Sequence, residues 1–149
     1  MLSNFDFLEL YKIAVEVYEK RIESLCKRAN LASQALSLLL FLSTNPDHKT
    51  AKEICSRQNI KANLISFHIN NLVKEGYLVS EKSAQDKRKC ILSITSKAQP
   101  LIEESNKILE KYREEFFSNF SPSEVETYES CFNSLRANLL KMKKVSPAM

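Results

Sequence analysis

The stretch INNLVKEGYLVSEKSAQDKRKCILSIT, residues 69–95, changes its hydrophobic pattern twice. An apolar helical face ends at Gly76, a residue type that commonly closes helices. Two short runs follow, at 77–81 and 90–94, and both are rich in the β-branched and aromatic residues typical of strands. Between them lies SAQDKRK, residues 83–89, a mostly basic turn. The stretch therefore predicts a helix followed by a β-hairpin with a basic tip.

The sequence before this stretch predicts further helices. Residues 33–42 form a short apolar segment, and TAKE at 50–53 is a capping box that opens a helix ending near Gln58. Asn59 tolerates the left-handed conformation of a sharp turn. A helix over 61–74 follows, and its apolar face is formed by Ile65, Ile69, Leu72 and Val73. Two helices joined by a tight turn and followed by a hairpin predict a winged helix–turn–helix, whose second helix enters the DNA major groove.

Long amphipathic helices are expected at both ends of the chain. Apolar residues alternate in steps of three and four over 5–28 and again over 122–144, where SPSE at 121–124 supplies a capping box. A helix over 96–119 comes between, and Pro100 should kink it or delay its first regular turn. Such seams pack along another helix, either within the chain or in a second copy, and we expect a homodimer. The expected interface residues are Leu8, Tyr11, Val15, Tyr18, Val125, Tyr128, Phe132, Leu135, Leu139 and Met142.

The fold class that follows is mainly α with a small β-hairpin wing. We expect a winged helix–turn–helix DNA-binding domain at residues 31–95. An N-terminal dimerisation helix should occupy residues 1–30 and C-terminal dimerisation helices residues 96–145, with a short tail at 146–149.

Positive charge is concentrated in the middle of the chain. The whole sequence carries a formal charge of +4, but residues 49–89 hold nine basic and four acidic residues, which gives +5, and the remainder is close to neutral at −1. This placement favours a polyanionic partner such as double-stranded DNA. The main alternative, a helical dimeric adaptor that binds protein, explains the charge less well, because protein interfaces lose charge from their centre.

The helix over 61–74 should present polar side chains opposite its apolar face. Asparagine is suited to bidentate contact with adenine, and serine can bond base edges. Phe67 could contact a thymine methyl group or tuck against the neighbouring helix. The expected DNA-binding residues of this helix are Lys61, Ala62, Asn63, Ser66, Phe67, His68, Asn70 and Asn71.

The hairpin tip adds a second set of expected DNA contacts. A turn of this length is held by its strands and leaves its tip free, and arginine is favoured in a narrow minor groove. Asp86 could orient the Arg88 guanidinium or stabilise the turn as an Asx residue. The expected wing residues are Lys82, Asp86, Lys87, Arg88 and Lys89.

Residues 50–54 and 69–102 resemble the MarR/SlyA family of bacterial transcriptional regulators. The positions that fit its pattern in order and spacing are Leu72, Gly76, Tyr77, Leu78, Asp86, Arg88, Ile94 and Thr95. The resemblance implies a dimer built from the terminal helices, two winged units on a palindromic DNA site, and Arg88 in the minor groove. It also implies a small, often aromatic or phenolic effector between the dimer helices and the winged unit. Asn59 stands where relatives often carry Gly, and Phe67 stands where many carry Arg, which suggests a different operator.

Other chemistry finds little support in the sequence. No catalytic triad motif, phosphate loop or metal-ligand spacing is present, so we expect no enzyme, cofactor or metal. Cys26 could serve a thiol-redox-sensing regulator or be a small buried hydrophobe, and Cys55 and Cys90 are expected in the core. The longest apolar run, at 38–42, is too short to span a bilayer, and no signal peptide is evident. We therefore expect a cytoplasmic DNA-binding regulator, acting as a repressor.

Overall fold

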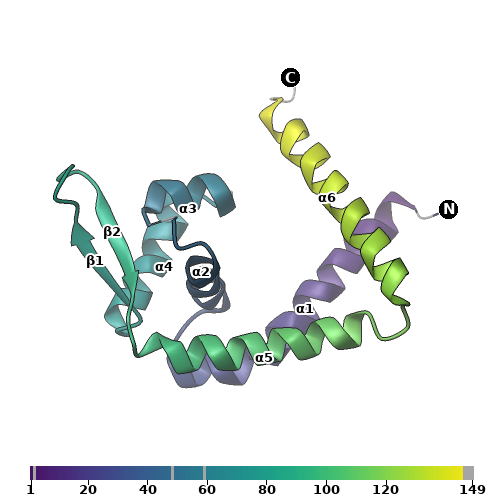
Figure 1. Ribbon diagram of the computed structural model, residues 1–149, viewed down its shortest axis with the longest axis horizontal. Helices are drawn as coiled ribbons and strands as arrows, with labels where there is room; N and C mark the ends of the chain where they lie inside the picture. The colour runs from purple at the N-terminus through teal and green to yellow at the C-terminus, as the bar shows by residue number, and fades with distance from the viewer. Residues whose placement is uncertain (2, 48, 59, 146–149) are drawn as a thin grey trace. The chain divides into compact units, whose positions relative to one another are not determined.

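The computed structural model describes residues 1, 3–47, 49–58 and 60–145 (Figure 1). In chain order the elements are α1 (Asn4–Ala29), α2 (Ser33–Thr44), α3 (Ala51–Gln58), α4 (Ala62–Lys74), β1 (Leu78–Lys82), β2 (Cys90–Ile94), α5 (Ala98–Phe116) and α6 (Pro122–Lys144). The chain divides into a larger unit, Met1–Glu110, and a smaller unit, Lys111–Met149, and the boundary falls within α5. The mainly α fold with a small hairpin is confirmed, while Asn59 and the expected tail lie outside the described residues.

The ends of α1 and α4 are set by residues that adopt the left-handed conformation. Asn30, with a φ of 54°, follows α1, and Gly76, with a φ of 79°, follows α4. The Gly76 N–H donates to the Val73 carbonyl at 3.0 Å, and the Tyr77 N–H donates to the Leu72 carbonyl at 2.9 Å. This pair of bonds is the Schellman arrangement, which satisfies carbonyls at a helix end. The only glycine of the sequence stands where a side chain would strain the backbone.

The starts of α5 and β1 differ from expectation for local reasons. Helix α5 begins at Ala98 instead of residue 96, with Pro100 in its first turn. Proline lacks an N–H group and is tolerated only there, so the delay matches one of the two expected effects. Strand β1 begins at Leu78 because the Tyr77 N–H closes helix α4. Helix α6 starts at Pro122, behind a complete capping box of Ser121 and Glu124.

Helix α2 supplies much of the core of the larger unit. Its buried residues are Ala35, Leu36, Leu38, Leu39, Leu40 and Leu42. Residues from α1, α3 and α4 join them, including Ile22, Ile54 and Ile65, all with no exposed surface. Each fully buried side chain of this size contributes about 1.5–3 kcal/mol. Val73 was expected in this core but is 38% exposed, because one step of about 100° along α4 turns it away from Leu72.

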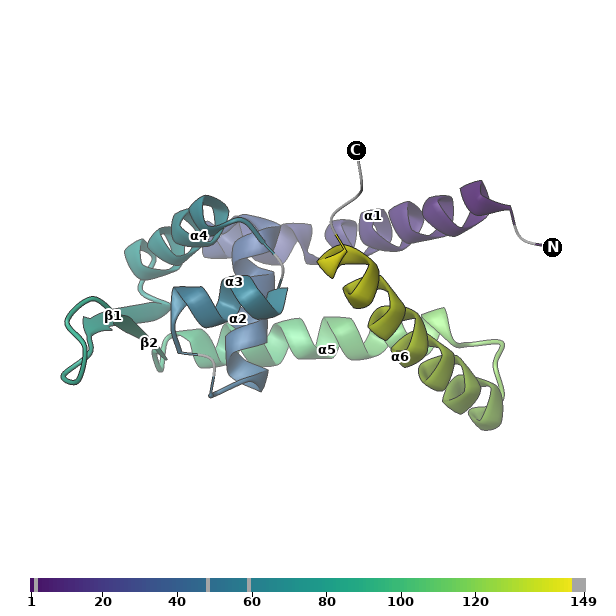
Figure 2. The same cartoon turned by 90° about the horizontal axis from the view of Figure 1, so that it is seen from above.

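The hairpin is anchored at its base and extends beyond the helices at its tip (Figures 1 and 2). Strands β1 and β2 are antiparallel, with Leu78 opposite Ile94 and Lys82 opposite Cys90. At the base, the Thr95 hydroxyl donates to the Gly76 carbonyl at 2.7 Å. The threonine that follows the second strand therefore ties the hairpin to the end of α4.

The smaller unit joins the end of α5 to the start of α6 through aromatic side chains. Tyr128 packs against Phe116 and Phe117, with ring centroids 6.3 Å and 5.2 Å away. An ion pair joins Arg113 to Glu129 at 2.6 Å. None of the described residues of α6 is buried. Beyond this aromatic cluster, the apolar side chains of α6 are therefore largely exposed to solvent.

Candidate nucleic-acid interface

Helix α4 presents a polar face with one aromatic residue at its middle. Lys61, the N-cap, makes no side-chain hydrogen bond to the first turn of the helix. The expected contacts that are exposed on this face are Lys61, Ala62, Asn63, Ser66, Phe67 and Asn70. Phe67 is 65% exposed, which excludes the alternative that it tucks against a neighbouring helix. Amide, hydroxyl and phenyl groups are all suited to base edges in a major groove.

His68 does not belong to this exposed face. It is only 8% exposed, and burial lowers the pKa of its imidazole, so the ring is neutral near pH 7. This burial disfavours the expected contact between His68 and DNA. Its place on the helix explains the burial, because His68 lies about 40° from Leu72 and about 60° from Ile65 around the axis.

Asn71 is directed toward the protein instead of solvent. It is half-buried, and its amide nitrogen donates to the Asn30 carbonyl at 3.5 Å. The Asn30 amide in turn donates to the Glu75 carboxylate at 2.8 Å. These bonds link the end of α1 to the end of α4, so Asn71 serves the position of the helix within the unit.

The wing tip is shaped by two short side chains. The Asp86 carboxylate accepts from the Arg88 N–H at 3.0 Å, which is an Asx turn. The Ser83 hydroxyl accepts from the N–H groups of Gln85 and Asp86 at 3.2 and 3.3 Å. Of the two roles considered for Asp86, this geometry supports the turn, and the Asp86 backbone carbonyl accepts from Lys89 at 2.9 Å.

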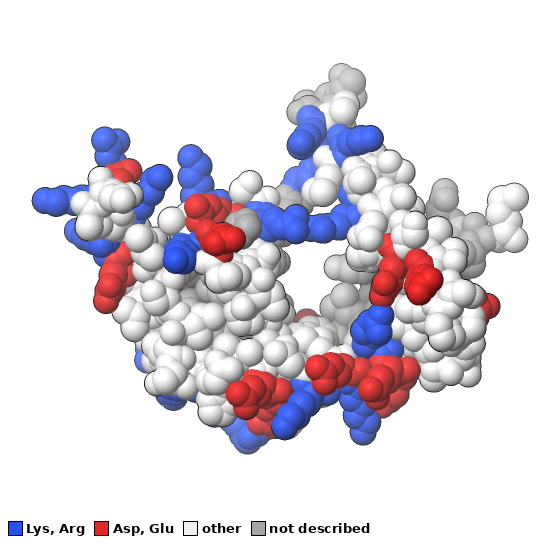
Figure 3. All heavy atoms as spheres, in the orientation of Figure 1, with Lys and Arg blue, Asp and Glu red and all other residues white. Residues whose placement is uncertain are grey.

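The cationic side chains of the wing are left outside this hydrogen-bonded turn. Lys82, Lys87, Arg88 and Lys89 are all exposed. None of them forms an ion pair within the described part of the chain. Figure 3 shows the blue spheres of lysine and arginine surrounding the hairpin tip. The arrangement is a rigid turn that carries unpaired positive charge away from the core.

A cavity of about 290 Å³ lies within the larger unit, between α1, α2 and α4. Its wall includes Tyr18, Ser37 and His68, and the Tyr18 and Ser37 hydroxyls are 3.4 Å apart. The Nδ1 atom of His68 is buried and has no hydrogen-bond partner among the residues that the structure describes.

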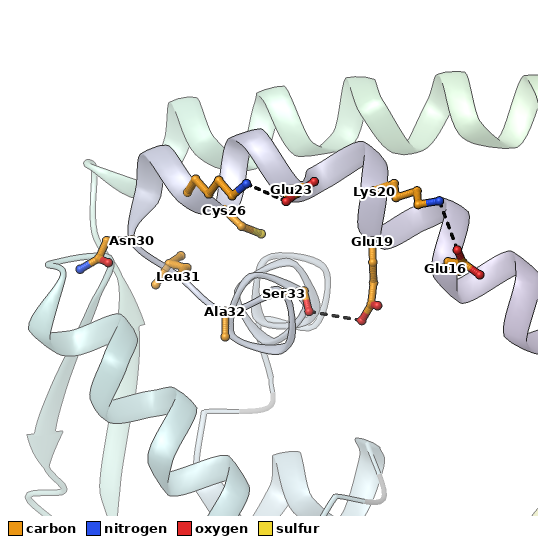
Figure 4. Close-up of a pocket in the computed structure, with 10 residues that line it drawn as sticks. Glu16, Glu19, Lys20, Glu23, Cys26, Asn30, Leu31, Ala32 and Ser33 are labelled. Atoms are coloured by element: carbon orange, nitrogen blue, oxygen red, sulfur yellow. Dashed lines mark hydrogen bonds and ion pairs between the residues drawn. The ribbon is translucent and has the colours of Figure 1, made fainter.

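A larger groove of about 640 Å³ runs between α1 and the start of α2 (Figure 4). Ion pairs Glu16–Lys20 and Glu23–Lys27 lie along it, at 3.2 and 2.6 Å. Cys26 lines the groove but is buried, and burial raises the pKa of its thiol. Reactive sensor cysteines need a lowered pKa, so this environment disfavours the redox-sensing alternative.

The remaining cysteines differ in part from expectation. Cys55 is half-buried, but Cys90 is exposed, which corrects its expected place in the core. Cys90 lies on the same strand face as buried Leu92, two residues nearer the tip, where the hairpin has passed the edge of the helices. No group of three or more metal-ligating side chains occurs among the described residues. Within the same residues, no helix is long and apolar enough for a transmembrane segment.

The residues expected at a dimer interface fall into two classes. Val15 and Tyr18 line the cavity in the larger unit and are only half exposed. Leu8 and Tyr11, earlier in α1, are 56% and 67% exposed. In the smaller unit Val125 is half-buried, and the exposed members are Tyr128, Phe132, Leu135, Leu139 and Met142. The apolar stripe of α1 therefore packs into the core of the larger unit along the second half of the helix, and it is exposed along the first half.

Comparisons with known proteins agree with this architecture. Residues 29–89 match the model of the MarR family. A curated relative, the uncharacterized HTH-type transcriptional regulator YwoH of Bacillus subtilis (strain 168), is 30% identical over 83 residues, 56% of this chain. The aligned part spans only 60% of that relative's length.

Two solved structures share the fold over nearly the whole chain. One is a putative MarR family transcriptional regulator from Listeria monocytogenes complexed with 26mer DNA, with a TM-score of 0.83 and 18% identity; 100% of this chain and 99% of that chain are covered. The other is an S. aureus MepR–DNA complex, with a TM-score of 0.76 and 17% identity, covering 92% and 96%. At these identities the likeness shows the winged-helix fold.

Proposed function

We propose that the chain is a member of the MarR family of transcriptional regulators and a sequence-specific DNA-binding regulator that acts as a homodimer on a palindromic operator. The main support for this proposal is the structure of the wing. Its turn is fixed by Ser83 and Asp86, while the charges of Lys87, Arg88 and Lys89 remain unpaired in the described chain. These cations have no evident part in the fold, so we infer that they bind a polyanionic partner. The two DNA complexes among the structural neighbours support this reading.

The proposed binding mode uses both parts of the winged unit. Helix α4 enters the major groove and presents Asn63, Ser66 and Asn70 to base edges. Lysines of the wing neutralise phosphates and release counterions, and Arg88 enters the minor groove. A dimer would space two such helices about one DNA turn, roughly 34 Å, apart. Bound at a promoter in the bacterial cytoplasm, the protein would act as a repressor.

A second copy of the chain is the proposed cover for the exposed apolar stripes. Leu135, Leu139 and Met142 of α6 are 50%, 54% and 68% exposed, and Tyr11 of α1 is 67% exposed. Monomeric proteins rarely leave contiguous apolar stripes in water, and such patches mark interfaces. Homodimer interfaces are also the more apolar class.

The cavity beside His68 supports an effector that releases the protein from DNA. A small aromatic or phenolic molecule could occupy this cavity, whose wall includes the hydroxyl groups of Tyr18 and Ser37. His68 belongs to α4, so a molecule that binds only one position of that helix would change DNA affinity. A panel of simple phenols should then lower the affinity of the wild type for DNA. His68→Met keeps most of the side-chain volume but changes the wall of the cavity on α4, and it should weaken this response.

The DNA-binding proposal is tested by fluorescence anisotropy. We would titrate the protein into a labelled duplex from the region upstream of its own gene, at several salt concentrations and with a scrambled competitor. Tight binding that survives the competitor, with log affinity falling steeply against log salt, is the expected result.

Weak binding that does not depend on sequence would contradict a regulator acting at this site. If a randomised duplex library also enriched no motif, sequence-specific binding as a whole would be excluded. The adaptor alternative would then account better for the exposed apolar stripes.

A further inference from the structure

Phe67 occupies the centre of the exposed face of α4. Around the helix axis it lies about 160° from both Ile65 and Ile69, which are buried. Its exposed fraction, 65%, is the highest of any large hydrophobic residue described between 31 and 95. A residue pointing directly away from the core contributes little to folding, so its aromatic character needs another explanation.

The Phe67 ring has one aromatic neighbour. It meets the His68 ring edge-on, with centroids 5.4 Å apart and an interplanar angle of 74°. His68 is buried and lines the cavity, so this ring pair joins the exposed face of α4 to its buried side. Such edge-to-face pairs are a favoured aromatic geometry. Phe67 is therefore an oriented apolar group on an otherwise polar face.

A phenyl ring carries no hydrogen-bond donor or acceptor for base edges. The apolar feature that the major groove offers is the 5-methyl group of thymine. Asn63 and Asn70 lie about 40° and 60° from Phe67 on the same face, and asparagine is suited to adenine. Adenine pairs with thymine, so these three side chains together fit both members of neighbouring A·T pairs.

We propose that Phe67 is a specificity-determining residue that reads a thymine methyl group in each half-site of the operator. The inference rests on the proposed function, because it requires α4 to lie in the major groove. A protein surface is the other partner that an exposed phenylalanine could serve. The surrounding Asn63, Ser66 and Asn70 favour a base edge instead, since protein interfaces gather further apolar residues around such an anchor.

The test removes the methyl group from the DNA and the ring from the protein. Wild-type protein first selects duplexes from a randomised library. In the selected duplex each thymine is then replaced, one symmetric pair at a time, by deoxyuridine, which lacks only the methyl group. We expect one position where the replacement weakens wild-type binding about fourfold per half-site, the effect of returning one methyl-sized group to water.

Protein variants assign that effect to Phe67. In Phe67→Ala the affinity ratio between the thymine and uracil duplexes should fall to about one at that position, while Phe67→Leu should keep part of the ratio. Asn63→Ala is the comparison: it should weaken binding to both duplexes and leave their ratio near its wild-type value. Thermal melting of each variant checks that the fold is retained.

The outcomes separate this inference from the function on which it rests. A library that enriches no motif defeats sequence-specific binding itself. A clear motif whose thymines all tolerate deoxyuridine overturns the role of Phe67 and leaves the regulator intact. A uracil effect that persists undiminished in Phe67→Ala also overturns it, because another residue would then read the methyl group.

Discussion

Helices α2 and α6 use their apolar residues in opposite ways. Helix α2 has twelve residues, of which six are buried. Helix α6 has 23 residues, and none of those described is buried, although its leucines and aromatics recur with strict periodicity. The core around α2 is completed within one chain, whereas the apolar stripe of α6 remains exposed in the described chain. Stability of the larger unit and assembly of the protein should therefore respond to different mutations.

The largest effect is expected where the completed core is opened. Leu39→Ala, in α2, removes a side chain with no exposed surface and should lower the free energy of unfolding by about 2–5 kcal/mol. Leu64→Ala is the matched control, because Leu64 is 47% exposed on α4; it should stay within about 0.5 kcal/mol. Urea denaturation followed by circular dichroism measures both. Equal losses would mean that burial in α2 does not set stability.

A charge placed on the α6 stripe should affect assembly most. In Leu135→Glu a carboxylate would be buried in the proposed interface at a cost of several kcal/mol, so the dimer dissociation constant should rise at least about 100-fold. Light scattering over a dilution series measures this. Ala137→Glu, about 160° around the same helix, is the control and should leave the dimer intact. A dimer that survives Leu135→Glu would show that the stripe is not the interface.

The wing should separate DNA binding from stability. Arg88→Ala should weaken binding to the operator by about 1–3 kcal/mol, the range for one good groove contact. Its unfolding free energy should change by less than about 0.5 kcal/mol, because Arg88 is exposed and makes no ion pair among the residues described. Lys107→Ala removes an exposed charge from α5 and should alter affinity little. Anisotropy titrations at fixed salt compare them, and equal affinities of Arg88→Ala and wild type would remove the wing from the mechanism.

The smallest effect concerns the polar group inside the completed core. Burial lowers the pKa of His68 in the folded state, so below its ordinary pKa of about 6.5 the unfolded chain binds a proton that the native chain does not. Stability is thus greatest above that pH and falls as the pH decreases, by at most about 1.4 kcal/mol per pH unit. Tyr18 and Glu19 face the same cavity.

His68→Met should remove this part of the pH dependence. Urea midpoints at pH 7.5 and pH 5.5 measure it as the difference between wild type and variant. If the urea midpoints of wild type and variant changed equally between the two pH values, the pKa of His68 would be the same in the folded and unfolded states.

Features decided by neighbouring residues were predictable from the sequence. Ser121, Pro122 and Glu124 mark the start of α6, and the structure places it at that residue. Gly76 was expected to end α4 and does so with a positive φ. Both follow from capping chemistry, which depends only on residues a few positions away.

Features decided by three-dimensional surroundings were less predictable. The polar imidazole of His68 suggested a solvent-exposed side chain, although its angular position beside Leu72 on the helix indicated burial. Cys90 suggested a core strand, but the length of the hairpin beyond the helices leaves it exposed. The apolar periodicity of α1 was visible, but not that Ile22 and Leu25 enter the core of the larger unit while Leu8 and Tyr11 remain outside. A periodic stripe predicts that a helix packs, and it does not identify the partner.

The position of Phe67 also bears on how such a protein can diverge. The buried residues of α4, such as Ile65 and Leu72, carry its share of the core, and Phe67 points the opposite way. Exchanges at the exposed positions 63, 66, 67 and 70 should then cost little stability, because surface substitutions usually stay within about 0.5 kcal/mol. After gene duplication, one copy could acquire a new operator by single substitutions without passing through unfolded intermediates. The buried face of α4 would then keep the fold, while its exposed face, which we propose binds DNA, could change by substitution.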